Sequence, residues 1–188
     1  MSKLGIVGVT GVVGNKFLEV IDEYNLVFDE IKLFASKKSE GKIIKFQNKD
    51  YVINSLNEGC FLDLDYVLFS AGSKVSEKWC LEAEKEGCIV IDNSSAFRFF
   101  DDIPLIVSEV NMDDFYLSKR KIIANPNCST MQCIVILDLI NKINKLKKVY
   151  YSTYQAVSGA GKKGIDDLLN IKKGCFSLDI NKTCIPII

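Results

Sequence analysis

The feature that most constrains the fold of this chain is the alternation of short apolar runs with segments of helical periodicity. Five runs have the length and composition of buried strands: residues 3–8, 31–35, 65–70, 88–91 and 121–124. Between them, residues 12–24 and 74–86 repeat apolar positions at helical spacing, and residues 42–46 and 51–53 are expected to form a hairpin or a sheet edge. The alternation predicts an α/β fold with a doubly wound parallel sheet and right-handed crossovers. Ligands of such sheets bind at the carboxyl ends of the strands.

The character of the sequence changes after residue 128. A long apolar helix is expected over 130–146, then a strand over 148–156, a glycine-rich loop over 157–164 and a helix over 165–171. We interpret this as two domains, 1–128 and 129–188, of which the second is only the beginning of an α+β domain. The chain stops on an apolar run, which suggests a truncated product.

Composition excludes several classes of protein. The 188 residues contain no histidine, so this chain cannot form a Ser-His-Asp triad, a Cys-His pair or an HExxH zinc site. The 24 basic and 24 acidic residues cancel, which gives no electrostatic reason to bind nucleic acid or an anionic membrane. The sequence shows neither a signal peptide nor an apolar run of the roughly 20 residues that span a bilayer.

The seven cysteines, an odd number without a CxxC pair, fit neither a zinc site nor a disulfide framework. We therefore expect no metal, no disulfides, a reducing cytoplasm and mostly buried cysteines. Cys133, inside the apolar helix, is expected in the core.

A glycine-rich turn follows the first strand. Gly8, Thr10, Gly11 and Gly14 lie between a strand and a helix, which is the context of a dinucleotide-binding turn. Glycines let the backbone approach a pyrophosphate, and the helix start supplies amide donors. The pattern departs from GxGxxG, and the alternative is a plain tight turn.

The tip of the second strand favours NADP over NAD. NAD enzymes usually place an acidic residue there, but Asp29 and Glu30 precede this strand. The tip instead carries Ser36, Lys38 and Ser39, whose hydroxyls and ammonium suit a 2′-phosphate. The alternative is a solvated surface loop.

Two further strand ends carry candidate chemistry. Cys128 follows Asn127 at the start of the long helix, where the helix dipole and free amides stabilise a thiolate, so it is a candidate nucleophile. The alternative is a buried structural cysteine. Arg98 follows the strand 88–91 beside amide and hydroxyl groups, which suits a phosphate or carboxylate. The alternative is a salt-bridged loop arginine.

Together these motifs give the chain a clear resemblance to aspartate-semialdehyde dehydrogenase. The matching stretches follow the family's order: Gly8–Gly14, Phe34–Gly41, Phe69–Ser76, Asp92–Arg98, Pro104–Asn111, Ile123–Thr130 and Ser152–Gly161. N-acetyl-glutamyl-phosphate reductase shares the architecture, but its cysteine motif differs from Asn-Pro-Asn-Cys-Ser-Thr.

The resemblance implies a Rossmann-like domain followed by the start of a catalytic and dimerisation domain. It implies NADP-dependent reduction of aspartyl 4-phosphate to aspartate 4-semialdehyde with release of phosphate, on the route to lysine, methionine and threonine. Cys128 would be the nucleophile, Gln155 would orient the substrate, and Arg98 and Asn127 would hold the phosphate. The cofactor residues implied are Thr10, Gly11, Val12 and Val13 at the pyrophosphate, Ser36 and Lys38 at the 2′-phosphate, and Ser158 and Gly159 at the nicotinamide. The family is homo-oligomeric, as a dimer or tetramer.

The absence of histidine departs from the family. In the family a histidine is the acid/base partner of the cysteine, and full-length members are considerably longer. Three hypotheses follow: an enzyme that works when the remaining residues are present, a fragment that binds NADP without chemistry, or a non-functional remnant.

Overall fold

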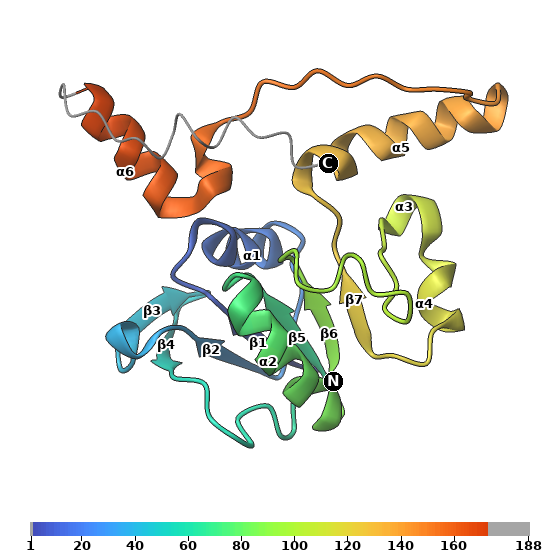
Figure 1. The fold of residues 1–188 in the computed structure, drawn as a ribbon. Coiled ribbons are helices and arrows are strands. Elements are labelled where there is room, and N and C mark those ends of the chain that lie inside the picture. Colours follow the sequence, from blue (N-terminus) through green and yellow to red (C-terminus); the bar gives the residue numbers. More distant parts are fainter. Residues whose placement is uncertain (1, 173–188) are drawn as a thin grey trace. The chain divides into compact units, whose positions relative to one another are not determined.

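The computed structural model describes residues 2–172, and in them a seven-stranded sheet forms the centre of the fold (Figure 1). The strands are β1 (Lys3–Val7), β2 (Glu30–Phe34), β3 (Ile43–Phe46), β4 (Lys49–Asn54), β5 (Tyr66–Phe69), β6 (Ile89–Asp92) and β7 (Ile122–Ala124). Their order across the sheet is β3-β4-β2-β1-β5-β6-β7, and every pair is parallel except β3 with β4. The predicted doubly wound parallel sheet and its edge hairpin are confirmed.

Six α-helices and two 3-10 turns complete the described elements. The helices are α1 (Val12–Glu23), α2 (Ser73–Lys85), α3 (Ser108–Asn111), α4 (Asp113–Leu117), α5 (Cys128–Ile143) and α6 (Gly161–Lys172), and the turns are η1 (Lys37–Ser39) and η2 (Val157–Ala160). None of the helices described is long and apolar enough to cross a membrane.

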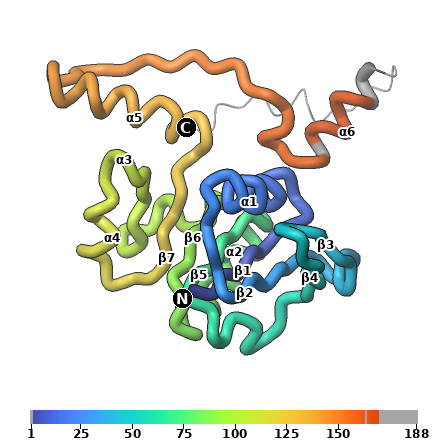
Figure 2. The backbone as a smooth tube through the Cα atoms, turned by 180° about the vertical axis from the view of Figure 1, so that it is seen from behind, coloured from blue at the N-terminus to red at the C-terminus, as the bar shows by residue number. Residues whose placement is uncertain are grey.

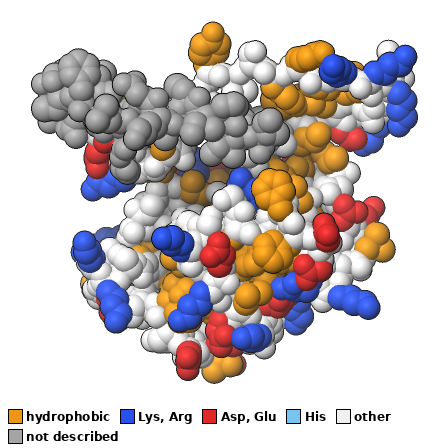
Figure 3. Space-filling model, in the orientation of Figure 1, with side chains coloured by type: hydrophobic (Ala, Val, Ile, Leu, Met, Phe, Trp, Pro, Cys, Tyr) orange, Lys and Arg blue, Asp and Glu red, His pale blue; other side chains and the backbone are white. Residues whose placement is uncertain are grey.

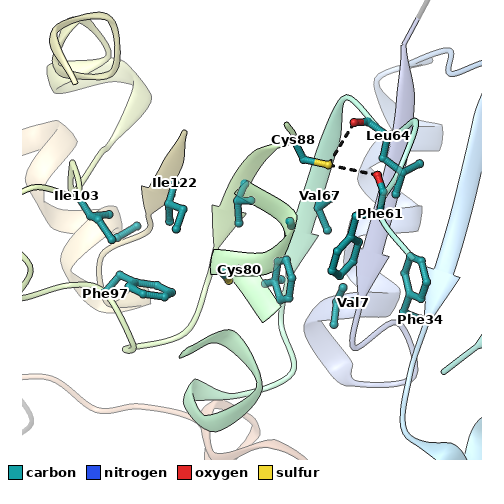
Figure 4. Packing of buried hydrophobic residues seen from close by; sticks show 14 residues of the cluster. Val7, Phe34, Phe61, Leu64, Val67, Cys80, Cys88, Phe97, Ile103 and Ile122 are labelled. Atoms are coloured by element: carbon teal, nitrogen blue, oxygen red, sulfur yellow. Dashed lines mark hydrogen bonds between the residues drawn. The ribbon is translucent and has the colours of Figure 1, made fainter. Parts of the chain in front are cut away.

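Two apolar clusters, one under α1 and one under α2, hold the helices to the sheet. Leu18 and Ile21 of α1 pack in a cluster with Leu4 and Ile6 of β1. Cys80 and Ala83 of α2 pack in the other cluster, which takes Val7 from the same strand (Figure 4). Because neighbouring side chains of a strand point to opposite faces, α1 and α2 cover opposite faces of the sheet, as double winding requires.

Residues 2–149 belong to one compact unit, and residues from Tyr150 onward belong to a second. In the first unit the β3–β4 hairpin lies at one edge of the sheet, and α3 and α4 lie beyond β7 at the other edge (Figure 2). Over the lower part of the face drawn in Figure 3, lysine and arginine side chains are interspersed with aspartate and glutamate side chains, whereas blue side chains predominate at the upper right.

Two expectations about the later part of the chain were wrong, and a third was right except at its ends. Residues 148–156 form no strand, because a strand needs a hydrogen-bonded neighbour and the described residues provide none. The predicted long helix is present but occupies Cys128–Ile143 instead of 130–146, and none of its residues is buried. Cys133 is consequently half-buried, not part of a core.

Candidate functional site

The site begins at one row of residues that pair with one another across the parallel strands of the sheet. Val7 of β1 pairs with Phe34 on one side and with Phe69 on the other, and the row continues through Asp92 to Ala124. The residues that follow this row begin the loops that the sequence predicts to be functional. Loops far apart in sequence therefore leave the sheet along a single edge, the edge where ligands of such sheets bind.

The turn between β1 and α1 has a geometry that only glycine fits. Gly8 has a φ of +87°, and a Cβ there would lie 2.8 Å from the Ser70 carbonyl carbon. A Cβ on Gly14 would lie 2.2 Å from the Gly8 oxygen. Gly11 is the N-cap of α1 and has no side chain that could accept hydrogen bonds from the first backbone amides of the helix. Those amides can therefore bind an anionic ligand. Thr10, Val12 and Val13 are exposed beside these amides.

The tip of β2 carries hydroxyl and ammonium groups rather than an acid. Ser36 precedes the short turn η1, and its carbonyl accepts a hydrogen bond of 2.8 Å from the Ser39 amide. Lys38 is exposed in that turn. Glu30 lies at the opposite end of the strand, where its carboxylate is 3.5 Å from the Lys3 ammonium. The structure thus places the acid away from the cofactor edge, as the sequence predicts.

Arg98 links two of the loops at the carboxyl edge. Its Nε donates to the Asn125 carbonyl at 2.9 Å, and its Nη2 donates to the Asn93 carbonyl at 3.3 Å. Burial lowers the pKa of the guanidinium, and the negative charge of Asp92 acts against that shift. Asn125, whose carbonyl Arg98 holds, lies three residues before Cys128. The predicted alternative, a salt-bridged surface arginine, does not describe this residue, whose partners are carbonyls.

Asn127 caps the helix that begins with Cys128. Its Oδ1 accepts hydrogen bonds from the Ser129 amide at 3.0 Å and from the Ser129 hydroxyl at 2.7 Å. The Cys128 thiol donates to the same oxygen at 3.8 Å. This arrangement leaves the Asn127 amide nitrogen available to an anion. The cap holds an exposed thiol at a helix start, where a thiolate is stabilised.

The other described thiols have surroundings unlike that of Cys128. Cys88 is buried and donates to the carbonyls of Phe61 and Leu64 at 3.5 and 3.2 Å (Figure 4). Burial raises the pKa of Cys88 to about 11 and raises that of Cys80 further still. Cys60 is half-buried, and burial raises its pKa as well. Cys175 and Cys184 lie outside the described residues. Among the described cysteines, Cys128 alone is exposed.

Gln155, Ser158 and Gly159 belong to the second unit. Gln155 is exposed and donates to the Thr153 hydroxyl at 3.0 Å. Ser158 and Gly159 lie exposed in η2. A Cβ on Gly164 would lie 2.5 Å from the Val157 oxygen, so the glycine lets α6 pack against this turn. The structure brings the other predicted site residues together in the first unit, and these three form a separate group.

Sequence reasoning missed the residues that support Arg98. Asp92, Asn93, Ser76 and Asn125 all hydrogen-bond within or beside the Arg98 loop. A signal for one of them was present, because Asp92 ends a strand and a serine follows two residues later. Aspartates in that position often bond to the backbone two residues ahead.

A doubly wound sheet with a glycine turn at its central strand is a dinucleotide-binding domain. More particularly, the chain belongs to the semialdehyde dehydrogenase family. Residues 3–117 match the family model described as "Semialdehyde dehydrogenase, NAD binding domain", and residues 137–188 match "Semialdehyde dehydrogenase, dimerisation domain". The predicted domain boundary at 128 lies between the two matches and stays a prediction.

Several relatives carry the name aspartate-semialdehyde dehydrogenase. The protein from Aquifex aeolicus is 50% identical over 173 residues, which are 91% of this chain and 51% of the relative. That from Campylobacter jejuni is 43% identical over 183 residues, or 96% of this chain and 53% of the relative. A crystal structure of aspartate semialdehyde dehydrogenase II from Vibrio cholerae, complexed with ASA, has a TM-score of 0.86 at 41% identity and covers 94% of this chain and 54% of its own. The chain spans about half the length of these relatives.

Proposed function

We propose that this chain acts in the NADP-dependent reduction of aspartyl 4-phosphate to aspartate 4-semialdehyde, on the route to lysine, methionine and threonine. One observation carries the proposal: the exposed thiol at the start of α5 follows by three residues the Asn125 carbonyl that Arg98 holds at 2.9 Å, at the sheet edge that also holds the glycine turn. The names of the relatives support the choice of substrate.

The residues of the first unit fit a dinucleotide. The backbone at Gly8 and Gly14 is packed too closely to admit a Cβ, and the exposed amides at the start of α1 face outward for a pyrophosphate. Ser36, Lys38 and Ser39 suit the 2′-phosphate of NADP, and this is the reason to prefer NADP to NAD. Ser158 and Gly159 would contact the nicotinamide side.

Cys128 would attack the acyl phosphate as a thiolate. Its sulfur forms a bond to the carbonyl carbon, the bond from that carbon to the phosphate oxygen breaks, and phosphate leaves. Arg98 and Asn127 would hold the phosphate through N–H donors, and Gln155 would orient the amino-acid portion. The reduced cofactor, when bound, supplies the hydride that reduces the thioester.

The absence of histidine supports a second candidate: a chain that binds NADP but does no chemistry. Release of the aldehyde requires proton transfer, and the 188 residues contain no histidine, the side chain whose unperturbed pKa lies nearest neutrality. We also propose a dimeric or tetrameric assembly, which the name of the second family model supports, and a cytoplasmic location, which the free cysteines of the described residues support.

A single-turnover experiment distinguishes the two candidates. The chain is mixed with aspartyl 4-phosphate, the released phosphate is measured, and the protein is analysed by mass spectrometry. The first candidate predicts an aspartyl thioester on Cys128 and one phosphate released per chain. Cys128→Ser should abolish both signals, and Cys133→Ser should retain them.

Two results would change this view. NADP binding in a calorimetric titration without any thioester would favour the binding-only candidate. An adduct that persists in Cys128→Ser would show that another residue is the nucleophile.

A further inference from the structure

Asp92 is a fully buried carboxylate for which the proposed chemistry gives no role. It ends β6 and has an exposed fraction of 0%. A buried carboxylate is costly unless hydrogen-bond donors surround it. Three donors do so: the Ser76 hydroxyl at 2.7 Å, the Ser94 amide at 3.1 Å and the Ser94 hydroxyl at 2.7 Å.

These bonds wind the loop after β6 around the carboxylate. Ser94 contacts it through both backbone and side chain, and the Ser94 hydroxyl in turn accepts the Ala96 amide at 3.1 Å. Ser76 fixes the same carboxylate to α2, and a hydroxyl contact of 2.9 Å between Ser73 and Ser95 adds a second link to that helix. The shape of the loop up to residue 96 therefore depends on Asp92.

The loop closes a ring of hydrogen bonds that includes Arg98. The Asn93 carbonyl accepts from the Arg98 guanidinium, which also donates to the Asn125 carbonyl. The backbone amide of Asn125 donates to the backbone carbonyl of Asp92 at 2.8 Å. Two of the five guanidinium N–H donors are used in this way, which leaves the others for an anion.

We propose that Asp92 is a positioning residue for Arg98: its buried carboxylate, tied to α2 by Ser76 and to its own loop by Ser94, sets the direction in which the guanidinium presents its remaining donors at the loop that leads to Cys128. The inference rests on the anion-binding role given to Arg98 in the proposed function. Asp92 itself touches neither substrate nor thiol.

The test compares two alkylating reagents at Cys128. Iodoacetate carries a negative charge and iodoacetamide does not. The rate with iodoacetate divided by the rate with iodoacetamide therefore reports the positive field that Arg98 directs at the Cys128 sulfur. Both rates are measured on the 188-residue chain by mass spectrometry, with fragmentation that separates Cys128 from Cys133 in their shared tryptic peptide. No turnover is needed.

Arg98→Gln sets the scale and should lower the ratio about fivefold, the effect of one unit charge about 4 Å away when bulk water screens it. Asp92→Ala and Ser76→Ala should lower it towards the same value because the guanidinium loses its orientation. Asp92→Asn should keep the ratio at or above that of the unmodified chain, since the amide oxygen still accepts from Ser76 and from the Ser94 amide.

Glu86→Ala is the matched control. The Glu86 carboxylate accepts two backbone amides, from Gly59 and Phe61, at the other end of α2. Its loss should lower the melting temperature without changing the ratio. If Asp92→Ala does not fold, Ser76→Ala carries the test.

An unchanged ratio in Ser76→Ala and Asp92→Ala, alongside a reduced ratio in Arg98→Gln, would overturn this inference and leave the proposed function intact. A raised ratio in Asp92→Ala would also overturn it. That result is expected if the Asp92 carboxylate only neutralises part of the Arg98 charge and does not orient the guanidinium. An unchanged ratio in Arg98→Gln would refute the anion-binding role of Arg98 itself.

Discussion

Replacement of Gly14 by alanine separates two physical effects of opposite sign. Alanine is favoured over glycine within a helix by about 1 kcal/mol, so helix propensity alone predicts a stabilised protein. The structure predicts the reverse. The new Cβ would lie 2.2 Å from the Gly8 oxygen and 2.7 Å from the Gly8 carbon, and both are backbone atoms that cannot rotate away.

The size of the effect follows from the displacement required. The start of α1 must move by about 1 Å to restore an ordinary contact, and overpacking of this kind costs up to about 3 kcal/mol. After the gain in propensity the net loss is about 2 kcal/mol, which corresponds to a fall in melting temperature of about 4–8 °C for a chain of this length. NADP affinity should fall as well, because the displaced amides are those proposed to bind the pyrophosphate.

The assay is thermal unfolding followed by circular dichroism, with NADP titrations on the folded protein. Gly11→Ala is the matched control in the same turn: its Cβ would lie 3.2 Å from the same oxygen, so its effect on stability should stay below about 1 kcal/mol. A Gly14→Ala protein as stable as the unmodified chain would refute the steric reasoning.

Three further predictions concern other parts of the first unit. Arg120→Met should cost about 1–3 kcal/mol, measured by urea unfolding, because Arg120 holds the Glu84 carboxylate with bonds of 3.0 and 2.7 Å. Burial tends to raise the pKa of Glu84, but hydrogen bonds from Arg120 and the Lys121 amide outweigh it, so the folded pKa is lowered. The stability that this carboxylate adds is complete above its unfolded pKa and is lost as pH falls through the lower folded pKa, and Arg120→Met should weaken that acid dependence, because only the Lys121 amide then remains to lower the pKa of Glu84. Lys38→Ala should weaken NADP binding about tenfold in calorimetry and leave NAD binding unchanged, whereas an equal loss for both would refute the assignment to the 2′-phosphate. Cys128→Ser should remove the fastest-alkylating thiol in a mass-spectrometric time course, and persistence of that phase would place the reactive thiol elsewhere.

Much of the sheet could be predicted because its strands are apolar and bounded by glycine or polar loops. β1 is buried on both faces, and the partly exposed positions of β5 and β6 still carry apolar or aromatic side chains, so all three runs read as continuous apolar segments. The helices α3 and α4 were not predicted, since elements of four and five residues are too short to show a helical period. The expected strand at 148–156 failed for a different reason: residues with strand propensity form a strand only beside a partner.

The candidate site could be predicted in part, because some of its residues act through local geometry and others through distant contacts. Gly14 and Cys128 show their roles in their neighbours, a strand before and a helix after. The bond from Ser76 to Asp92 comes from α2, and the bond from Arg98 to the Asn125 carbonyl joins the loops after β6 and β7, so no local pattern of residues encodes these two pairings.

The hydrogen bonds of Arg98 link the proposed anion site to the loop that leads to the proposed nucleophile. Arg98 holds the carbonyl of Asn125, three residues before Cys128, so a shift of the guanidinium is expected to shift the start of α5 as well. In the proposed reaction, formation of the thioester depends on how a phosphate held by Arg98 is placed relative to the Cys128 sulfur, and both residues belong to the first unit. Release of the aldehyde depends instead on proton transfer, for which the 188 residues supply no histidine. The proposed function therefore predicts a stoichiometric reaction of aspartyl phosphate with Cys128 and no turnover by this chain.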